Sequence, residues 1–499
     1  MSRLGRHMAW FTVGILLVSV CAINTAVADT KDLAQLKAQL ASQEAQLAAL
    51  QQQVAARSAQ DTNAARADMM RQQIREILGE QEFRESLMPS MMQAGYDNGF
   101  FIRSSDDKFL MKVNALAQFR WTHYGTRSDN RYLLPRQERD DRTGFDMQRL
   151  RICFSGHAYS EDLTYLLELR TDAANSYDAI LSWAYIDYRL CDSVRFRFGK
   201  FKGASTRANT TAHHNLQMIS RPMVDAVFGA GFVLGARMHG QLFENKVDYY
   251  LDVVNSLSQG ENFGGGRTIT ADPAELDGNP AILFRVVWHA LAENNAKDFV
   301  SQSDIERHES LAFDLGFHYL FNDDAGDLQT TRIPFPRRTI LEGGWGLTNT
   351  NGLQIHQMGL DAAFKYQGFS AIGEYIIRMV DPRRAGRTPF APWWLLTGDD
   401  SSTAQHGAYV QAGYFLPIPG HENKIEAVAR VGAISALAED QECTWEYGAG
   451  LNYYLEGNNV KLMTDVIKYS EVPITSSYKS MANVNDDALI WRVQLQVAF

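Results

Sequence analysis

From about residue 100 onward, the chain alternates apolar and polar residues with a period of two. The final run, "ALIWRVQLQVAF", has one face that is wholly apolar, made of Leu489, Trp491, Val493, Leu495, Val497 and Phe499. A period of two indicates a β-strand whose two faces meet unlike surroundings. Such a strand fits a soluble sandwich, whose polar face meets bulk water. It equally fits a membrane barrel, whose apolar face meets lipid and whose polar face meets a wet lumen.

The links between the alternating segments decide between these two folds. We expect about sixteen strands, near 108–121, 145–159, 162–170, 181–190, 193–201, 230–242, 245–254, 281–290, 309–320, 356–367, 368–380, 405–416, 422–433, 446–455, 459–469 and 488–499. Short links alternate with long polar ones, except at 291–308, where a long link stands in place of a short one. Short turns at one rim and long loops at the other are typical of bacterial outer-membrane barrels. We therefore predict an all-β membrane protein, a transmembrane antiparallel β-barrel of about sixteen strands over residues 96–499.

The N-terminus has the order of a secretory signal. Basic residues at Arg3, Arg6 and His7 precede the apolar run "AWFTVGILLVSVCAI", and "AVA" at 26–28 offers small residues for cleavage. We predict a signal peptide over 1–28. After it, no apolar stretch approaches the roughly 18–20 residues that a membrane helix needs. A closed barrel is the other structure that satisfies its backbone hydrogen bonds in lipid.

Between the signal and the barrel, the sequence predicts helix. Residues 29–60 place apolar side chains at heptad a and d positions, namely Leu33, Leu36, Leu40, Leu47, Leu50 and Val54, with Gln43 interrupting one d site. This pattern favours a coiled coil, with a lone amphipathic helix as the alternative. Residues 61–95 are expected to form a helical linker. An even number of strands puts both barrel ends at the short-turn rim, so the coiled coil is expected in the periplasm.

Charge and motifs exclude several classes of function. Removing residues 1–28 takes away Arg3 and Arg6 and no acid, so the net charge of −10 becomes −12. An acidic chain argues against nucleic acid as a partner, but it does not set the selectivity of a channel, which depends on local charges. We find no G-x-S-x-G, H-E-x-x-H or P-loop pattern, and the odd cysteine set predicts no disulfide framework or zinc site. We predict no enzyme, no cofactor and no metal, with an outer-membrane hydrolase as a minor alternative.

Several segments resemble one family in their order along the chain. "GFDMQRLRICFSGHAYSEDLTYLLEL" resembles its early strand pair, and "LSWAYIDYRL" followed by "RFRFGKFKGAST" resembles its strand–turn–strand leading into a basic loop. "AYVQAGYFL", "IEAVARVGAIS" and "YGAGLNYYLEGNNVKLMTDVIKY" resemble its closing strands. The family is the phosphate-selective porin O and P family. The resemblance implies a passive trimeric channel with a basic pore lining and a third surface loop that folds inward.

The third long link, 202–229, is the candidate constriction loop. It has a single acid, Asp225, against the basic candidates Lys202, Arg207, His213, His214 and Arg221. A narrow pore lined by cations lowers the entry cost for anions, and arginine can hold phosphate bidentately. The alternative is a solvated loop whose charges bind lipopolysaccharide phosphates. The adjacent pair of histidines alone does not predict a metal site.

Arginines on the strands form the second candidate set. Arg149 and Arg151 lie on one face of their expected strand, and Arg195 and Arg197 lie on one face of theirs. A charge that faces lipid near the midplane of the membrane costs about 2–4 kcal/mol. We therefore expect these side chains in the lumen, along an anion path: Arg149, Arg151, Arg195, Arg197, Arg285 and Arg430. Lumenal arginine is also ordinary in porins, where opposing acids cancel it.

The sequence thus predicts a porin of the bacterial outer membrane for passive diffusion of small anions, phosphate or polyphosphate among them. The alternatives are a general diffusion porin and a structural barrel that tethers the coiled coil to the cell wall. The expected partners are outer-membrane lipid and lipopolysaccharide, small anions, peptidoglycan, and two further copies of the chain in a homotrimer.

Overall fold

The computed structural model of the protein describes residues 30–59, 72, 92–127, 142–171, 179–255, 280–324, 353–382, 403–435, 443–470 and 487–499. The chain divides into two compact units, Met1–Pro89 and Ser90–Phe499. The expected signal peptide, most of the expected helical linker and most of the long links lie outside the described residues.

The first unit contains one long helix, α2 (Thr30–Ala59). The expected helical segment is therefore helical, and its coiled-coil pairing stays a prediction. Leu36, Leu40, Leu47 and Leu50 are all at least half exposed on the single chain. None of the helices in the described residues is long and apolar enough to cross a membrane.

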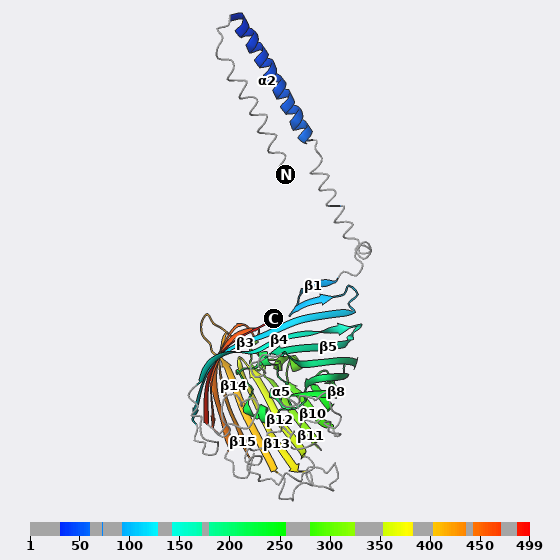
Figure 1. The fold of residues 1–499 in the computed structure, drawn as a ribbon, viewed down its shortest axis with the longest axis vertical. Helices are drawn as coiled ribbons and strands as arrows, with labels where there is room; N and C mark the ends of the chain where they lie inside the picture. The colour runs from blue at the N-terminus through cyan, green and yellow to red at the C-terminus, as the bar shows by residue number, and fades with distance from the viewer. Residues whose placement is uncertain are drawn as a thin grey trace. The chain divides into compact units, whose positions relative to one another are not determined.

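The second unit is a closed antiparallel barrel (Figure 1). Of the eighteen strands in its sheet, β1 and β2 form a hairpin and the other sixteen form the ring, which the pairing of β18 with β3 closes. The ring strands are β3 (Phe109–Arg127), β4 (Arg142–Ala158), β5 (Ser160–Thr171), β6 (Ile180–Cys191), β7 (Val194–Lys202), β8 (Phe232–Leu242), β9 (Val247–Val254), β10 (Ala281–Leu291), β11 (Ala312–Asp324), β12 (Leu353–Tyr366), β13 (Phe369–Pro382), β14 (Thr403–Phe415), β15 (Ile425–Ser435), β16 (Thr444–Glu456), β17 (Val460–Ser470) and β18 (Asp487–Ala498). The predicted strand number is confirmed, and each expected strand overlaps one observed strand.

The hairpin of β1 (Gln93–Tyr96) and β2 (Phe100–Arg103) extends the edge of β3 beyond its pairing with β18. The last residue, Phe499, exchanges two backbone hydrogen bonds with Ala115 on β3, with N···O distances of 2.8 and 3.0 Å. The chain end is therefore held in the ring beside the hairpin.

Tight turns set the register at the short-link rim. Between β12 and β13, Tyr366 pairs directly with Phe369, so the loop contains only Gln367 and Gly368. Both have positive φ, 48° and 84°. This conformation matches the right-handed twist of the flanking strands, and it favours a small residue such as Gly368. A fixed turn fixes which side chains of the two strands face the lumen.

The two faces of the wall have opposite chemistry. On β18, Leu489, Trp491 and Leu495 are exposed on the outside, whereas Arg492 and Gln494 are buried inside. The same alternation recurs along β12 to β17. An apolar outer face and a polar inner face are the arrangement expected of a barrel in lipid.

The long link between β7 and β8 folds into the lumen. It carries α5 (Arg207–Thr210), the 3-10 turn η2 (His213–Asn215) and α6 (Met223–Phe228). The side chains of α6 pack in one buried cluster with Ile376 of β13 and Tyr409 of β14. Each fully buried Met, Val or Phe side chain contributes about 1.5–3 kcal/mol. We call residues 203–231 the constriction loop.

A glycine on the wall makes room for this loop. A Cβ atom placed at Gly407 of β14 would lie 2.4 Å from the Phe228 ring, which is too close for any real side chain. The loop therefore docks against a strand position that only glycine can occupy without displacing the aromatic ring. The docked helix α6 fills the lumen along β13 to β15.

Candidate functional site

A cavity of about 490 Å³ lies in the lumen beside the constriction loop. Its lining comes from β6 to β11, from the first half of the constriction loop and from residues 296–300. The second half of the loop packs against β13 and β14, and the cavity lies beside its first half.

Cations dominate the charged lining of this cavity. The lining includes five arginine and lysine side chains, Arg197, Lys202, Arg207, Arg237 and Arg285, two histidines, His239 and His289, and two acidic side chains, Asp248 and Asp314. Other acids that pair with these arginines are Asp187, Asp252 and Asp361, and none of the three lines the cavity. A solute in the cavity therefore meets guanidinium and ammonium groups in front of partly hidden carboxylates.

Two arginines of the lining stand on neighbouring strands and are fixed in the same way. The Nε atom of Arg197 on β7 donates to Asp187 Oδ2 at 2.7 Å, and its guanidinium lies 4.0 Å from the centroid of the Tyr185 ring. Arg237 on β8 donates through Nε and Nη2 to Asp252 at 2.6 and 2.8 Å. Charge-assisted and bidentate contacts hold the planar groups in one orientation.

Arg207 attaches the constriction loop to the wall. It donates to Asp314 on β11 through Nη2 at 2.7 Å and to Asp361 on β12 through Nε at 2.6 Å. Burial disfavours its charge, but the carboxylates of Asp361 and Asp314 outweigh burial and raise the pKa of Arg207. Arg285 on β10 also binds Asp361, at 2.7 Å, and donates to the backbone oxygen of Ser205 at 2.9 Å. Both arginines therefore line the cavity and fasten the loop.

Lys202 is different from the arginines of the lining. Its ammonium group donates to the backbone oxygen of Asn209, and it forms no ion pair with any described residue. The side chain is buried at the end of β7, where the constriction loop begins. Its charge is therefore compensated less directly than that of the neighbouring arginines.

A second basic group lies where the constriction loop meets β4. Arg151 pairs with Glu168 at 3.3 Å and with His213 Nδ1 at 3.1 Å, and Arg149 donates to Gln118 at 2.9 Å. Burial and the neighbouring arginines, Arg149 first among them, hold the pKa of His213 well below its usual range. His213 is therefore neutral at neutral pH and can accept a hydrogen bond from an arginine.

The remaining loop candidates support the fold of the loop itself. Arg221 donates to the backbone oxygen of Ala208 at 2.6 Å and lies 3.6 Å from Asp225. Burial lowers the pKa of Arg221 to about 10, so it stays charged at neutral pH. Burial, with a smaller effect of Lys461, lowers the pKa of His214 to about 4. The contacts of Arg207 and Arg221 hold both side chains in place.

The last two strand candidates face the lumen in different surroundings. Arg195 on β7 is half-buried and lies between Arg189 and His239 in the sheet register. Arg430 on β15 is only 1 % exposed, binds Glu446 through Nε at 2.9 Å, and donates to the backbone oxygen of Ser220 at 2.8 Å. Arg430 therefore holds the second half of the constriction loop.

Sequence reasoning missed Arg237 and His239, which also line the cavity. His239 Nε2 lies 2.8 Å from Asp187 Oδ2, the oxygen that Arg197 also binds. The signal was present in "FVLGARMHGQL", where both residues lie on the polar face of an expected strand. Only the pairing of β8 with β7 places them beside Arg197.

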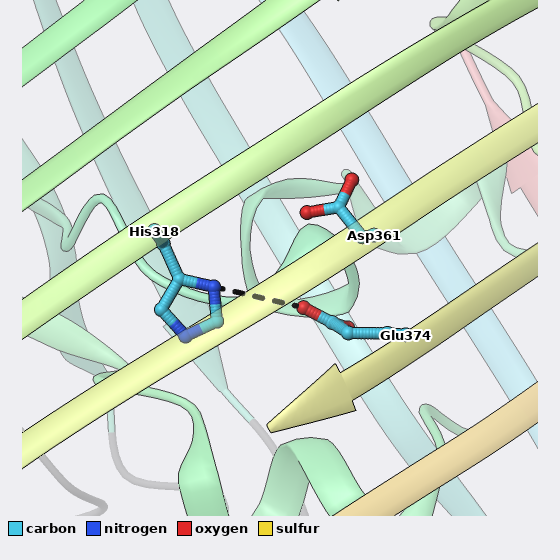
Figure 2. Close-up of side chains that lie close together, drawn as sticks. All are labelled: His318, Asp361 and Glu374. Atoms are coloured by element: carbon cyan, nitrogen blue, oxygen red, sulfur yellow. Dashed lines mark ion pairs between the residues drawn. The ribbon is translucent and has the colours of Figure 1, made fainter. Parts of the chain in front are cut away.

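Three buried side chains, His318, Asp361 and Glu374, resemble a metal site at first sight (Figure 2). Their possible ligand atoms all lie within 4.8 Å of one another, and His318 Nδ1 is 4.0 Å from Glu374 Oε1. Asp361, however, is already bound by Arg207 and Arg285, and Glu374 Oε1 accepts from the backbone N–H of Arg207 at 3.0 Å.

The hydrogen bonds of Gln357 decide the tautomer of His318. Its amide nitrogen donates to the backbone oxygen of Phe228, and its amide oxygen accepts from Arg378. The same nitrogen lies 3.2 Å from His318 Nε2, which must therefore accept, so the proton is on Nδ1. A protonated Nδ1 cannot bind a metal, so these residues favour a role in holding the constriction loop.

A closed sixteen-strand barrel with an apolar outer face, a polar lumen and an inward-folded loop defines an outer-membrane porin. The family model for phosphate-selective porins O and P matches residues 123–499, and the chain belongs to that family. Family and fold point to a channel rather than an enzyme.

Solved structures with a similar fold include three outer-membrane proteins. OmpF of Salmonella typhi, in complex with daunomycin, is 11 % identical, with 81 % of this chain and 100 % of that chain covered and a TM-score of 0.47. OprB of Pseudomonas putida is 9 % identical, with 78 % and 94 % covered and a TM-score of 0.48. The channel DcaP of Acinetobacter baumannii is 11 % identical, with 77 % and 96 % covered and a TM-score of 0.45. The chain has no significant match among curated protein sequences.

Proposed function

We propose that this porin passes small anions by passive diffusion, with phosphate or polyphosphate among its solutes. The observation that carries the proposal is the excess of positive charge in the cavity lining, which contains five arginine and lysine side chains but only two carboxylates. The path would run along Arg197, Lys202, Arg207, Arg237 and Arg285, with Arg149, Arg151, Arg195 and Arg430 as further lumenal charges. Such a lining lowers the electrostatic cost of bringing an anion into a narrow pore.

The paired arginines suit conduction better than tight binding. Arg197 and Arg237 each hold a carboxylate already, so a passing anion meets a guanidinium whose charge is partly compensated. Conduction requires sites that attract an ion yet release it again. A series of weak sites meets this requirement. The same compensation supports the alternative of a general diffusion porin with little ion preference.

The sign of the reversal potential distinguishes these two functions. In a planar bilayer with a tenfold KCl gradient, we expect the single-channel reversal potential to have the sign for chloride preference. Added phosphate is expected to reduce the chloride current, because both anions would occupy the same cationic sites. A reversal potential near zero would support the general porin, and one of the opposite sign would contradict the proposal.

We further propose the arrangement of the chain around the barrel. Residues 1–28 would be a signal peptide, 29–60 a periplasmic coiled coil, 61–95 a helical linker and 96–499 the barrel in outer-membrane lipid and lipopolysaccharide. The exposed leucines of α2 support pairing with other copies, and the family resemblance suggests three. A helix bundle in the periplasm would also allow contact with peptidoglycan.

Deleting residues 31–57 should loosen the trimer without abolishing it, because barrel walls also pack together. We expect the trimer band to dissociate at lower temperature on a semi-native gel, while the barrel stays heat-modifiable. Replacing Gln35, Ser42 and Gln52 of the same helix with alanine is the matched control, because these changes leave every a and d position unchanged. A cross-linking ladder that stops at the dimer in the intact protein would contradict the trimer.

A further inference from the structure

The long link between β10 and β11, residues 292–311, enters the barrel from the rim of short turns. Within it, Gln302, Ser303 and Asp304 are 5 %, 1 % and 0 % exposed. The corresponding link between β12 and β13 has two residues. A simple chain reversal needs neither this length nor this burial, so the segment is expected to have a further role inside the barrel. We call residues 294–304 the rim insert.

The rim insert is bonded directly to the constriction loop. The backbone N–H of Gln302 donates to the backbone oxygen of Asn215 at 3.1 Å. In return, the backbone N–H of Gln217 donates to Gln302 Oε1 at 3.0 Å. The two segments enter the lumen from β10 and from β7, and these bonds join them inside it.

Contacts with β15, β16 and the β12–β13 turn also hold the insert in place. Ser303 Oγ donates to Glu426 Oε2 on β15 at 3.0 Å and lies 2.8 Å from the hydroxyl of Tyr454 on β16. Asp304 Oδ2 accepts from the backbone N–H of Gly368 in the β12–β13 turn at 2.7 Å. Since the contacted groups are buried or in a tight turn, the insert has a defined position.

The other side of the insert faces the cavity. Ala296, Phe299 and Val300 belong to its lining, together with the basic residues of the wall. The Phe299 ring stacks on His289, with a centroid distance of 6.2 Å and an interplanar angle of 14°. Lys365 Nζ lies 5.9 Å from the centroid of the same ring and donates to the backbone oxygen of Asp298 at 2.7 Å. Phe299 is thus an apolar part of the cavity lining that its contacts hold in place.

We propose that the rim insert is a second constriction element of the pore and that Phe299 sets the size limit for solutes. The proposal rests on the proposed function, because it takes the cavity as part of the conduction path. The constriction loop and the wall would provide the charge of the pore, and the rim insert would limit its diameter. Anions with a slender body would pass Phe299 within the cavity, and bulky anions would be held back.

The test compares Phe299→Ala with the wild type in planar bilayers. Because pore width limits conductance, we expect single-channel conductance in KCl to rise by about half or more. Permeation of a bulky organic anion such as gluconate should rise more than that of chloride. The reversal potential in a KCl gradient should stay the same, since no charge is changed.

The control is Phe243→Ala, in the turn between β8 and β9, where the ring is 76 % exposed and does not line the cavity. It should leave conductance unchanged. Phe299→Leu, which keeps most of the volume, should lie between the wild type and the alanine variant. A heat-modifiable Phe299→Ala barrel with wild-type conductance and wild-type gluconate permeation would overturn the inference. A reversal potential for cations in the wild type would refute the anion path while leaving the width effect of Phe299 intact.

Discussion

Replacing Lys202 with glutamine is expected to reduce the anion preference of the pore about fivefold. Lys202 is the lining lysine that forms no ion pair with a described residue, so its charge is compensated least. Because its burial disfavours that charge, the effect of the substitution should be larger at pH 6 than at pH 8. A unit charge about 4 Å from a passing ion contributes about 1 kcal/mol in water-like surroundings, which corresponds to that factor in a permeability ratio. The glutamine amide can keep the hydrogen bond to the Asn209 carbonyl. The measurement is the reversal potential in a tenfold KCl gradient.

Lys468→Gln is the matched control for this experiment. It makes the same charge change on β17, where the side chain is exposed on the outer face of the barrel. We expect its reversal potential to equal that of the wild type. If Lys202→Gln also leaves the reversal potential unchanged, the selectivity does not depend on the base of the constriction loop. The arginines of the wall would then be the remaining source of any preference.

Replacing Arg207 with alanine is expected to release the constriction loop. The change removes the closest ion-pair partner of Asp314 and leaves Asp361 paired with Arg285. Both carboxylates are nearly inaccessible to solvent. Breaking a buried ion pair by removing one partner typically costs about 3–5 kcal/mol. We expect the barrel to remain folded, because its strand ladder is untouched. Limited proteolysis should cut within residues 203–231, and the current should become noisier with a higher mean conductance.

A second substitution tests whether the ion pair is the cause. Adding Asp314→Asn to Arg207→Ala removes one of the stranded charges, so part of the protease resistance should return. Asp162→Asn is the control, because Asp162 pairs with Arg189 at a partly exposed site, where an ion pair contributes little. A loop that stays resistant to protease and a quiet current in Arg207→Ala would show that the other contacts of the loop, those of Arg285, Arg430 and α6, hold it without Arg207.

The strands and their connections could be predicted from the sequence, because they depend on interactions between residues that are close together in the chain. Alternation with a period of two identifies a strand wherever it occurs, and a turn such as Gln367–Gly368 specifies the register of the strands that it joins. The strand number, the closed barrel and the lumenal side of Arg197 were predictable for this reason. A basic loop in an acidic chain was also visible as a local excess of charge.

The tertiary structure decided which of these charges line the path and which hold the loop. Arg207 and Arg430 look alike in the sequence, and their surroundings depend on residues more than a hundred positions away, such as Asp314 and Ser220. The misfit at 291–308 was visible in the sequence, but its entry into the lumen depends on bonds to Asn215 and Glu426.

The sequence by itself therefore determined the barrel, because strand alternation and turn chemistry act between neighbouring residues. Only the tertiary structure determined the pore, because its width and charge arise where the constriction loop, the rim insert and the wall meet. Contacts of that kind depend on the closing of the ring, and no local pattern of residues encodes them.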